Sequence, residues 1–313
     1  MAKFTMMEVE AILNRLAGEK AEKFQHEVLY PQMARAMRIP LPDSQAVRDA
    51  LADPYYAFRT MLGYYAFAKR GNDRAEYSGF ALQALDKVLH GDKANFSAFL
   101  ASGNAPEQLW NAFVAVCQEN QRKINEQLNR GLIEGLAGYA ARLYAEDTIG
   151  NIWMDIQQAI VQSGRVEPIY QQITEIKGIG PKVGALVLRD MVALYDLESR
   201  IDAGDYHYLQ PVDTWIRRIG PLLSDEIDEK TADWVIAGKL AKLCRRNRVS
   251  GVRFNQGVQY LAIVELRDLE RLKGYLLSLA QSTLRAGGTG GGSSRAPAST
   301  GGRPAPRSFS WRR

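Results

Sequence analysis

Two residues with reactive side chains stand at the expected starts of helices, and one of them directly follows a tight turn. The segment IKGIGPKVGALVLRD places Lys182 just after a Gly-Ile-Gly turn. The segment QPVDTWIRRI places Asp213 before a second helical stretch. A neutral lysine amine is a nucleophile, and a carboxylate can stabilise developing positive charge or carry protons. The pair therefore predicts covalent catalysis through an amine, assisted by an acid.

Helices are expected on both sides of the turn. Pro181 suits the first position of a helix, because its φ is already helical and the N–H it lacks has no partner there. Apolar residues then recur at helical spacing, which predicts a helix from Pro181 to Tyr195. An apolar stripe predicts a short helix before the turn, and its members are Ile169, Ile173 and Ile176. The unit expected over 168–195 is helix, hairpin, helix.

The connection itself is expected to bind a phosphate. Gly178 and Gly180 can adopt positive φ angles, and their missing side chains let a ligand approach the backbone N–H groups. The positive end of the following helix also favours an anion such as a DNA phosphate. The residues expected to contact DNA are Lys177, Gly178, Ile179 and Gly180, together with Arg217 and Arg218 after Asp213 in the segment 210–220.

The two segments together resemble the helix-hairpin-helix DNA glycosylases, the superfamily of the endonuclease III-like and 8-oxoguanine glycosylases. GIGPKVGALVL followed by PVDTWIRR carries the resemblance, which extends from Tyr170 to Arg218. In bifunctional members, the lysine after the hairpin attacks the sugar and the aspartate of the VD[TV]-type motif assists. The resemblance implies these roles for Lys182 and Asp213. It also implies double-stranded DNA with a damaged base or an AP site as the partner.

Two departures separate this sequence from the endonuclease III-like members. Those enzymes usually hold an iron–sulfur cluster with four cysteines, whereas this chain has only Cys117 and Cys244. Lys182 and Asp213 are 31 residues apart, which is a long connection for the family. A long connection without a cluster resembles the archaeal 8-oxoguanine glycosylases and favours an oxidised purine. The extra segment 195–210 either lines the pocket or forms a surface loop.

Three functions remain open at this point. The first is a bifunctional glycosylase with AP-lyase activity, which the presence of Lys182 favours. The second is a monofunctional glycosylase that removes a modified or alkylated base with a water activated at Asp213. The third is a non-catalytic helix-hairpin-helix protein that binds DNA or another partner. Taken singly, a helix lysine and an N-cap aspartate are common structural features.

No cofactor is expected. The three histidines, His26, His90 and His207, are far apart, and neither cysteine stands at ligand spacing from a histidine, so no metal site is expected. The resemblance allows a monovalent ion on the backbone carbonyls of the hairpin.

Composition predicts a globular protein away from membranes. Hydrophobic residues make up 46% of the 313 residues, and the apolar runs are shorter than the ~18–20 residues of a membrane helix. The N-terminus does not have the pattern of a signal peptide. Two cysteines provide no disulfide framework and fit a reducing compartment. We therefore expect a monomer in the cytoplasm (nucleoid), or in the nucleus of a eukaryote.

The net charge of +5 belongs to the C-terminal tail. The segment 285–313 has six arginines and no acid, and its Gly, Ser and Pro content predicts disorder. The body, residues 1–284, has 34 basic and 35 acidic side chains, a net charge of −1. Any DNA binding by the body therefore depends on local patches. One candidate patch consists of Lys239, Lys242, Arg245, Arg246, Arg248 and Arg253.

The body is expected to be all-α, with a cleft between helical lobes. Thr5 and Glu8 predict a capping box at the start of the first helix. The apolar face expected for this helix is Met7, Ile12, Leu13 and Leu16, and a core stripe is expected at Tyr56, Leu62, Tyr65 and Phe67. Further helices are expected at 75–90, 106–146, 148–163, 230–247, 254–265 and 268–284. Four aromatic residues are candidates for base stacking, although core positions are favoured for each: Trp153, Trp215, Trp234 and Phe254.

Overall fold

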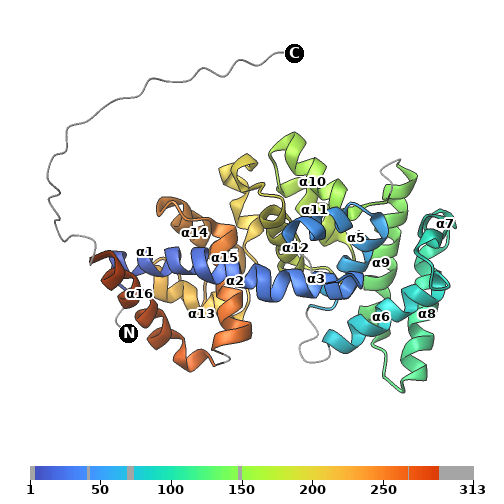
Figure 1. Cartoon of the computed structure of the whole chain (residues 1–313), viewed down its shortest axis with the longest axis horizontal. Coiled ribbons are helices and arrows are strands. Elements are labelled where there is room, and N and C mark those ends of the chain that lie inside the picture. Colours follow the sequence, from blue (N-terminus) through green and yellow to red (C-terminus); the bar gives the residue numbers. More distant parts are fainter. Residues whose placement is uncertain (1–3, 41–42, 69–73, 147–149, 267, 289–313) are drawn as a thin grey trace, which may run out of the picture.

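The computed structural model describes residues 4–40, 43–68, 74–146, 150–266 and 268–288 (Figure 1). Every regular element in these ranges is a helix, which confirms the all-α prediction. No helix in the same ranges is both long and apolar enough to cross a bilayer. The last helix continues to Gly288, past the boundary at residue 285 from which a tail was expected. Residues 289–313 of that tail lie outside the described residues.

Sixteen α-helices form the described chain. Those before residue 150 are α1 (Met6–Arg15), α2 (Ala21–Lys23), α3 (Tyr30–Met37), α4 (Ser44–Leu51), α5 (Pro54–Thr60), α6 (Arg74–Val88), α7 (Phe96–Ala101), α8 (Ala105–Glu119) and α9 (Glu126–Ala145). Those after it are α10 (Ile152–Ser163), α11 (Glu167–Glu175), α12 (Pro181–Leu194), α13 (Thr214–Leu223), α14 (Asp233–Arg246), α15 (Gly251–Tyr260) and α16 (Leu272–Gly288). Short π-helical turns adjoin several of these helices, at Leu16–Lys20, Phe24–Leu29, Met61–Tyr65 and Leu261–Glu265. Two 3-10 turns between α12 and α13 concern the site: η6 (Glu198–Arg200) and η7 (Ala203–Leu209).

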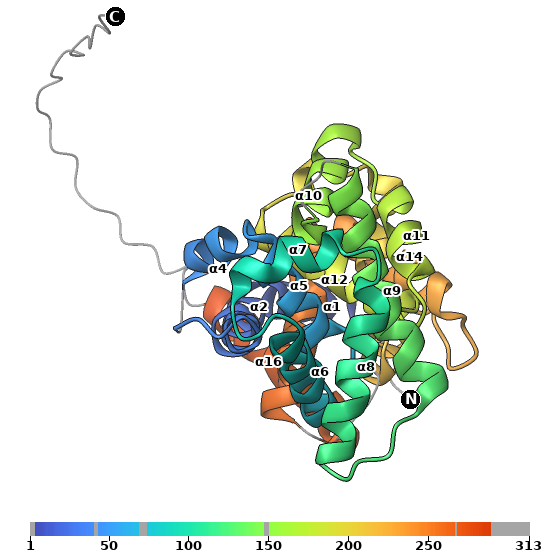
Figure 2. The same ribbon diagram turned by 90° about the vertical axis from the view of Figure 1, so that its right-hand side faces the viewer.

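The helices pack around two hydrophobic cores. The larger core holds buried residues from α3 through α12, and the smaller core joins α1 to α13, α14, α15 and α16. Figure 1 shows the helices of the smaller core at one end of the molecule and α6 to α9 at the other, and Figure 2 views it from the α6–α9 end. Helix α15 belongs to both cores, because Val252 and Tyr260 pack in the larger and Phe254 and Val258 in the smaller.

The N-terminal predictions are confirmed except for one residue. The Thr5 hydroxyl accepts a hydrogen bond from the Glu8 N–H at 3.3 Å, and the Glu8 carboxylate accepts one from the Thr5 N–H at 2.7 Å. Ile12 is fully buried, as are Leu13 and Leu16, but Met7 is 66% exposed. Met7 precedes Ile12 by five positions, which places it on the opposite side of a helix with 3.6 residues per turn.

The helix expected over 106–146 is instead two helices, α8 and α9. The chain leaves the helical conformation at Gln121, whose φ is +54°, and Asn125 then caps α9 by accepting a hydrogen bond from the Leu128 N–H at 3.2 Å. The aromatic stripe is confirmed as core: Leu62, Tyr65 and Phe67 are buried, and Tyr56 packs partly buried against them.

The segment 195–210 is folded against α11, α12 and α14 rather than extended into solvent. Asp205 anchors it, since its carboxylate accepts hydrogen bonds from the N–H groups of Val166 and Glu167 at 2.8 and 3.1 Å and from Arg165 Nε at 2.9 Å. Burial alone would raise the pKa of Asp205, but the hydrogen bonds from Arg165, Glu167 and Val166 outweigh burial and hold this pKa below its usual value. The segment is therefore attached to the N-terminus of α11.

Replacing Asp205 should destabilise the fold in a pH-dependent way. Asp205→Ala leaves the N–H groups of Val166 and Glu167 without their acceptor. We expect a loss of about 1–3 kcal/mol in the free energy of unfolding at pH 7, measured by urea denaturation. Because the folded-state pKa is lowered, the wild-type contribution is present above about pH 4 and is lost as the pH falls below the unfolded-state pKa of ~3.9.

Asp202→Ala provides the control, because Asp202 is an exposed carboxylate on the same segment. Its unfolding free energy should match that of the wild type. Equal stability of Asp205→Ala and Asp202→Ala would contradict the anchoring role.

Candidate functional site

Helices α11 and α12 are joined by a turn at residues 176–180, as the sequence predicts. Gly178 has φ +93°, and a Cβ atom there would lie 2.9 Å from Leu132 Cβ in α9, so both conformation and space require glycine. Gly180 differs from the expectation of positive φ, since its φ is −95°. It is the N-cap of α12, and its carbonyl accepts hydrogen bonds from the N–H groups of Val183 and Gly184 at 2.9 and 3.0 Å.

The turn presents backbone donors rather than side chains. Among the described residues, none accepts a hydrogen bond from the N–H of Gly178 or Gly180. The N–H of Ile179 is used within the turn, where it donates to the Ile176 carbonyl at 2.9 Å. The Ile179 side chain is only 2% exposed and belongs to the larger core. Any contact of Ile179 with a ligand would therefore pass through its backbone.

Lys177 points away from Lys182. Its side chain lies over Gly131 of α9, where an added Cβ would come within 2.5 Å of Lys177 Cδ. It lines a separate open pocket of about 520 Å3 with α9 residues that include Glu126, Arg130 and Glu134. Lys177 and Lys182 therefore belong to two different surfaces of the molecule.

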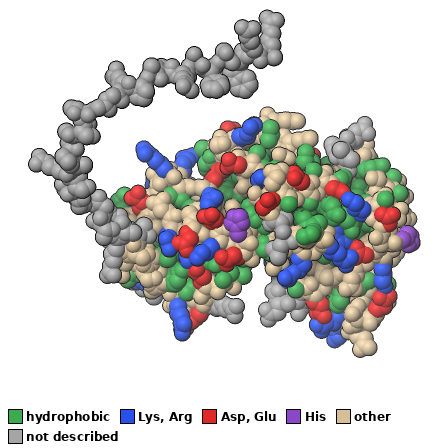
Figure 3. All heavy atoms as spheres, in the orientation of Figure 1, with side chains coloured by type: hydrophobic (Ala, Val, Ile, Leu, Met, Phe, Trp, Pro, Cys, Tyr) green, Lys and Arg blue, Asp and Glu red, His purple; other side chains and the backbone are tan. Residues whose placement is uncertain are grey.

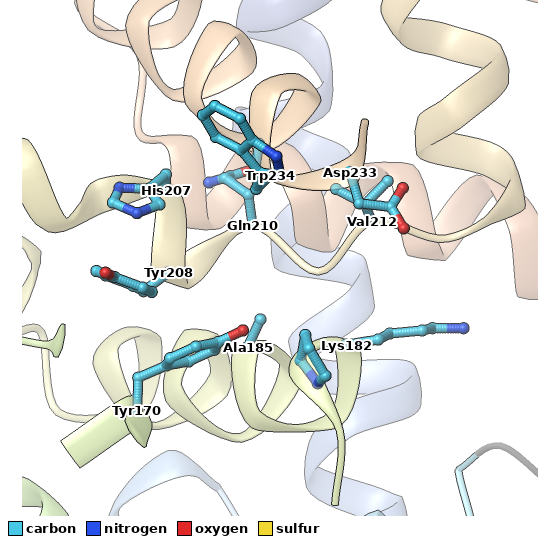
Figure 4. A pocket seen from close by; sticks show the side chains of 11 residues that line it. Tyr170, Lys182, Ala185, His207, Tyr208, Gln210, Val212, Asp233 and Trp234 are labelled. Atoms are coloured by element: carbon cyan, nitrogen blue, oxygen red, sulfur yellow. The ribbon is translucent and has the colours of Figure 1, made fainter. Parts of the chain in front are cut away.

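Lys182 lies in a pocket of about 400 Å3 (Figure 4). Helices α11 and α12 form one wall, η7 and the residues after it form the second, and α14 forms the third. The lining residues are Tyr170, Pro181, Lys182, Ala185, His207, Tyr208, Gln210, Val212, Asp233, Trp234 and Ala237. The segment 195–210 therefore lines the pocket, which decides between the two roles that the sequence left open for it.

The Lys182 side chain is available for a ligand. It is half-buried, and it forms no ion pair with any residue in the described ranges. In Figure 4 it extends away from Tyr170, Tyr208 and His207, so that its amine lies at the edge of the pocket on the side of Val212 and Asp233. Its place in the first turn of α12 puts it at the positive end of the helix dipole.

Asp213 is the N-cap of α13, as the sequence predicts. Its carboxylate accepts a hydrogen bond from the Ile216 N–H at 2.9 Å. Asp213 is half-buried and does not itself line the pocket, whereas its neighbour Val212 does. The structure thus brings the Asp213 segment to the pocket that contains Lys182, and the carboxylate is occupied on one side by its capping role.

Three aromatic rings form a continuous wall of the pocket. The ring centroids of Tyr170 and Tyr208 are 4.7 Å apart, and those of His207 and Tyr208 are 3.9 Å apart. Burial raises the pKa of Tyr170 and, together with the neighbouring Glu167, that of Tyr208. Both phenols are therefore neutral at physiological pH and can stack on a ring or donate a hydrogen bond.

Trp234 is the functional candidate whose position the sequence analysis misjudged. Trp153 and Phe254 are fully buried and Trp215 packs against the smaller core, but Trp234 is 74% exposed at the pocket. It lies in the first turn of α14, on the side opposite the buried Ile236 and Leu240. The apolar spacing of α14 was the available signal, because it already places Trp234 on the outer face.

Arg217 and Arg218 face an acidic connection between α13 and α14. Arg217 forms an ion pair with Asp233 at 2.6 Å, and Arg218 lies 3.6 Å from Glu229. All four side chains are largely exposed, and exposed pairs of this kind contribute only ~0–1 kcal/mol. A bound phosphate could therefore replace either carboxylate at little cost.

The two cysteines, which also have reactive side chains, are buried in different cores. Cys117 lies in the larger core and Cys244 in the smaller, and burial raises the pKa of the Cys244 thiol. In the described part of the chain, no three His, Cys, Asp or Glu side chains are grouped so that they could hold a metal ion.

A buried polar network holds the walls of the site together. Arg189, two turns after Lys182 on α12, is fully buried. It donates to Asp190 Oδ1 at 2.6 Å and to Asn255 Oδ1 at 2.8 Å, and Asn255 Nδ2 donates to the Pro211 carbonyl at 3.3 Å. The network therefore connects α12, α15 and the chain just before Asp213.

Removing the Asn255 amide should destabilise the protein more than removing a second acceptor at the edge of the network. Asn255→Ala leaves Arg189 Nη1 buried without a partner, and we expect a loss of about 1.5–3 kcal/mol in unfolding free energy. Gln259→Ala is the control, since Gln259 is half-buried and accepts from Arg189 Nη2 at 3.1 Å, a group that also donates to Asp190. Chemical denaturation of both variants tests the order, and a larger loss for Gln259→Ala would contradict it.

Comparison with protein-family models finds no match, and no curated protein or solved structure matches the chain. The resemblance of residues 170–218 to glycosylases therefore rests on those residues alone.

Proposed function

We propose that this protein is a DNA glycosylase with AP-lyase activity, in which Lys182 is the nucleophile and Asp213 assists. One observation carries the proposal: Lys182, without an ion-pair partner among the described residues, lines the same pocket as Val212, the residue directly before Asp213. The nucleophile thus lines a cavity that the chain reaches again 30 residues later at Val212, and the carboxylate follows at the next residue, the N-cap of α13.

The proposed reaction begins at the sugar of an extruded nucleotide. The neutral amine of Lys182 attacks C1′, and the bond from C1′ to the base nitrogen breaks, with its electron pair leaving on the base. The base takes up a proton, and the Asp213 carboxylate stabilises the positive charge that develops on the sugar. Loss of the amine proton and opening of the sugar ring give a Schiff base between C1′ and Lys182.

The lyase step follows from the Schiff base. Removal of a proton from C2′ sends its electrons toward the imine, and the bond from C3′ to the 3′ phosphate oxygen breaks in a β-elimination. Hydrolysis of the remaining imine releases Lys182. These reaction steps require only water, the amine and a proton carrier, so the proposal assigns no role to a metal or other cofactor.

The turn before α12 supports binding of the phosphate backbone. The N–H groups of Gly178 and Gly180 have no acceptor among the described residues, and they adjoin the positive end of α12. Backbone donors at a helix N-terminus form a suitable site for a phosphate oxygen. In this proposal the turn is the hairpin that binds a DNA phosphate next to the reacting sugar.

The pocket supports an extruded base as the substrate. Its volume of about 400 Å3 lies within the ~300–1,000 Å3 of small-molecule sites. The rings of Tyr170, Tyr208 and His207, with the exposed Trp234, offer aromatic faces, on which bases stack. We propose an oxidised base such as 8-oxoguanine, on the resemblance of the sequence to that branch. Such an enzyme would act as a monomer on DNA, in the cytoplasm (nucleoid) or in a eukaryotic nucleus.

Borohydride trapping tests the nucleophile. The wild type, mixed with a duplex containing 8-oxoguanine or an AP site and with borohydride, should form a covalent protein–DNA adduct on denaturing gels. Lys182→Ala should form none, because the Schiff-base nitrogen is gone, and Asp213→Asn should form adduct at least ~100-fold more slowly, the scale of general acid–base assistance. Lys87→Ala is the control and should form adduct at the wild-type rate, since it removes an exposed lysine of α6 that does not line the Lys182 pocket.

The result on the two duplexes separates the candidate functions. Release of the base without an adduct would replace the lyase with a monofunctional glycosylase that uses a water at Asp213. DNA binding with neither adduct nor base release would leave a non-catalytic helix-hairpin-helix protein. An adduct that persists in Lys182→Ala would overturn the choice of nucleophile.

Replacing Trp234 should slow the release of the base but not the trapping reaction on an AP site. Trp234→Ala removes an exposed ring of the pocket, so base release should slow by ~5–150-fold, equivalent to the ~1–3 kcal/mol of one base–aromatic stack. Trapping on a preformed AP site should stay close to the wild-type rate, because no base remains to be stacked. Leu128→Ala, an exposed apolar residue on α9, is the control and should leave both rates unchanged. Equal slowing of both reactions by Trp234→Ala would contradict a role in base recognition.

A further inference from the structure

Two further pockets adjoin the Lys182 pocket along the interface between η7 and α14. A pocket of about 150 Å3 shares His207 with the Lys182 pocket, and a pocket of about 380 Å3 shares Tyr206 and Arg245 with the small one. The 380 Å3 pocket also shares Gln210 with the Lys182 pocket. The three pockets therefore lie next to one another along this interface, from Lys182 and Trp234 to Arg245 and Arg248, and we call this row of pockets the groove.

The far part of this groove is lined by cations that form no ion pair within the described part of the chain. Lys242 and Arg245 line the small pocket, and Arg245 and Arg248 line the larger one. None of the three forms an ion pair with a residue in the described ranges, and all three are exposed. Other cations near the site are paired, as Lys239 is with Glu226 and Arg217 is with Asp233. The charge of the groove is thus available for an anionic partner.

Arg248 occupies a backbone position that favours glycine. Its φ is +56°, just after the C-cap of α14, where the left-handed conformation is common for glycine and costly for a residue with a side chain. The chain therefore holds an unpaired arginine at a strained position that lines the groove. Strain of this kind is found at functional sites.

The acids in the groove do not cancel these cations. Glu198 is committed to capping α15: its carboxylate accepts hydrogen bonds from the Ser250 hydroxyl and, at 3.1 Å, from the Gly251 N–H. Asp196 is exposed at the same pocket and forms no ion pair with Arg245 or Arg248. Both carboxylates keep their charge, so Lys242, Arg245 and Arg248 give the lining of the two pockets together a net charge of +1, and the excess lies at Lys242 and Arg245 in the small pocket.

We propose that this groove holds the phosphates of one DNA strand on one side of the extruded nucleotide. The inference rests on the proposed function, because it takes the Lys182 pocket as the position of the reacting sugar. From Trp234 to Arg245, α14 extends for about 16 Å at 1.5 Å per residue, and one strand of DNA carries a phosphate every ~3.4 Å along the helix axis. The groove is therefore long enough for the backbone of a few nucleotides.

The salt dependence of DNA binding tests this groove directly. The probe is a duplex with a tetrahydrofuran AP analogue, which binds but does not react, and the variant is Lys242→Gln/Arg245→Gln/Arg248→Gln in the full chain. The slope of log affinity against log salt is negative. Its magnitude should decrease by about 1 for each lost cation, or by about 3 in total. The control, Lys87→Gln/Lys93→Gln/Lys123→Gln, removes the same charge around α6 to α9 and should keep the wild-type slope.

The single variant Arg248→Gly separates binding from folding. Glycine adopts the left-handed conformation without strain, so the Tm should be equal to or higher than that of the wild type, whereas the salt slope should fall by about 1. A lower Tm together with unchanged DNA binding would overturn the role given to Arg248.

Shortened duplexes test whether the groove follows one strand in one direction. Trimming the duplex on one side of the AP analogue should abolish the difference between the triple variant and the wild type, and trimming on the other side should preserve it. The proposed role of the groove would be overturned if the triple variant binds like its control. It would also be overturned if the loss of affinity is the same on both trimmed duplexes. The probe cannot react, so these outcomes are independent of adduct formation, which tests the proposed chemistry. A wild type that binds no duplex at any salt concentration would overturn both.

Discussion

The fully buried guanidinium of Arg189 is the constraint on which the arrangement of the site depends. A charge buried without partners would cost several kcal/mol, so the surrounding chain must supply acceptors at fixed positions. Asp190 supplies one from the same helix and Asn255 supplies one from α15. Since Asn255 also binds the Pro211 carbonyl, the segment that leads to Asp213 is held at a defined place relative to α12. The network thus fixes the mutual position of the two segments without lining the pocket itself.

Around this framework, the site is built from the starts of helices. The N-termini of α12 and α14 line the Lys182 pocket, and α13 begins just after Val212. Three helix starts therefore lie at or next to one cavity, and the start of α12 favours an anionic ligand, whereas Asp213 and Asp233 already offset the dipoles of α13 and α14. The body of the chain is nearly neutral, and in the view of Figure 3 its Lys and Arg side chains are interspersed with Asp and Glu. Attraction for a phosphate is accordingly local, and it comes from backbone groups and a few unpaired side chains.

The acidic connection between α13 and α14 weakens the attraction of the site for a phosphate. Asp233 lies at the pocket and is paired with Arg217, so the arginine is held near the site in the free protein. An exposed pair of this kind contributes little to stability, and its partners can exchange for a phosphate. The groove beyond the pocket differs, because Lys242, Arg245 and Arg248 have no such internal competitor in the described chain. Positive charge is thus paired with carboxylates beside the Lys182 pocket and unpaired along the proposed path of the strand.

The sequence by itself determined the local elements of this protein: the turn between α11 and α12, Lys182 in the first turn of a helix, the Asp213 cap and the all-α class. These depend on φ preferences, capping and apolar spacing, which act between residues close together in the chain. Only the tertiary structure decided that 195–210 lines the pocket, that the outer face of α14 with Trp234 borders it and that Lys177 lines a different pocket. It also decided which cations are paired. The physical reason is that burial and charge pairing depend on distances between segments remote in sequence, and no local pattern encodes those distances.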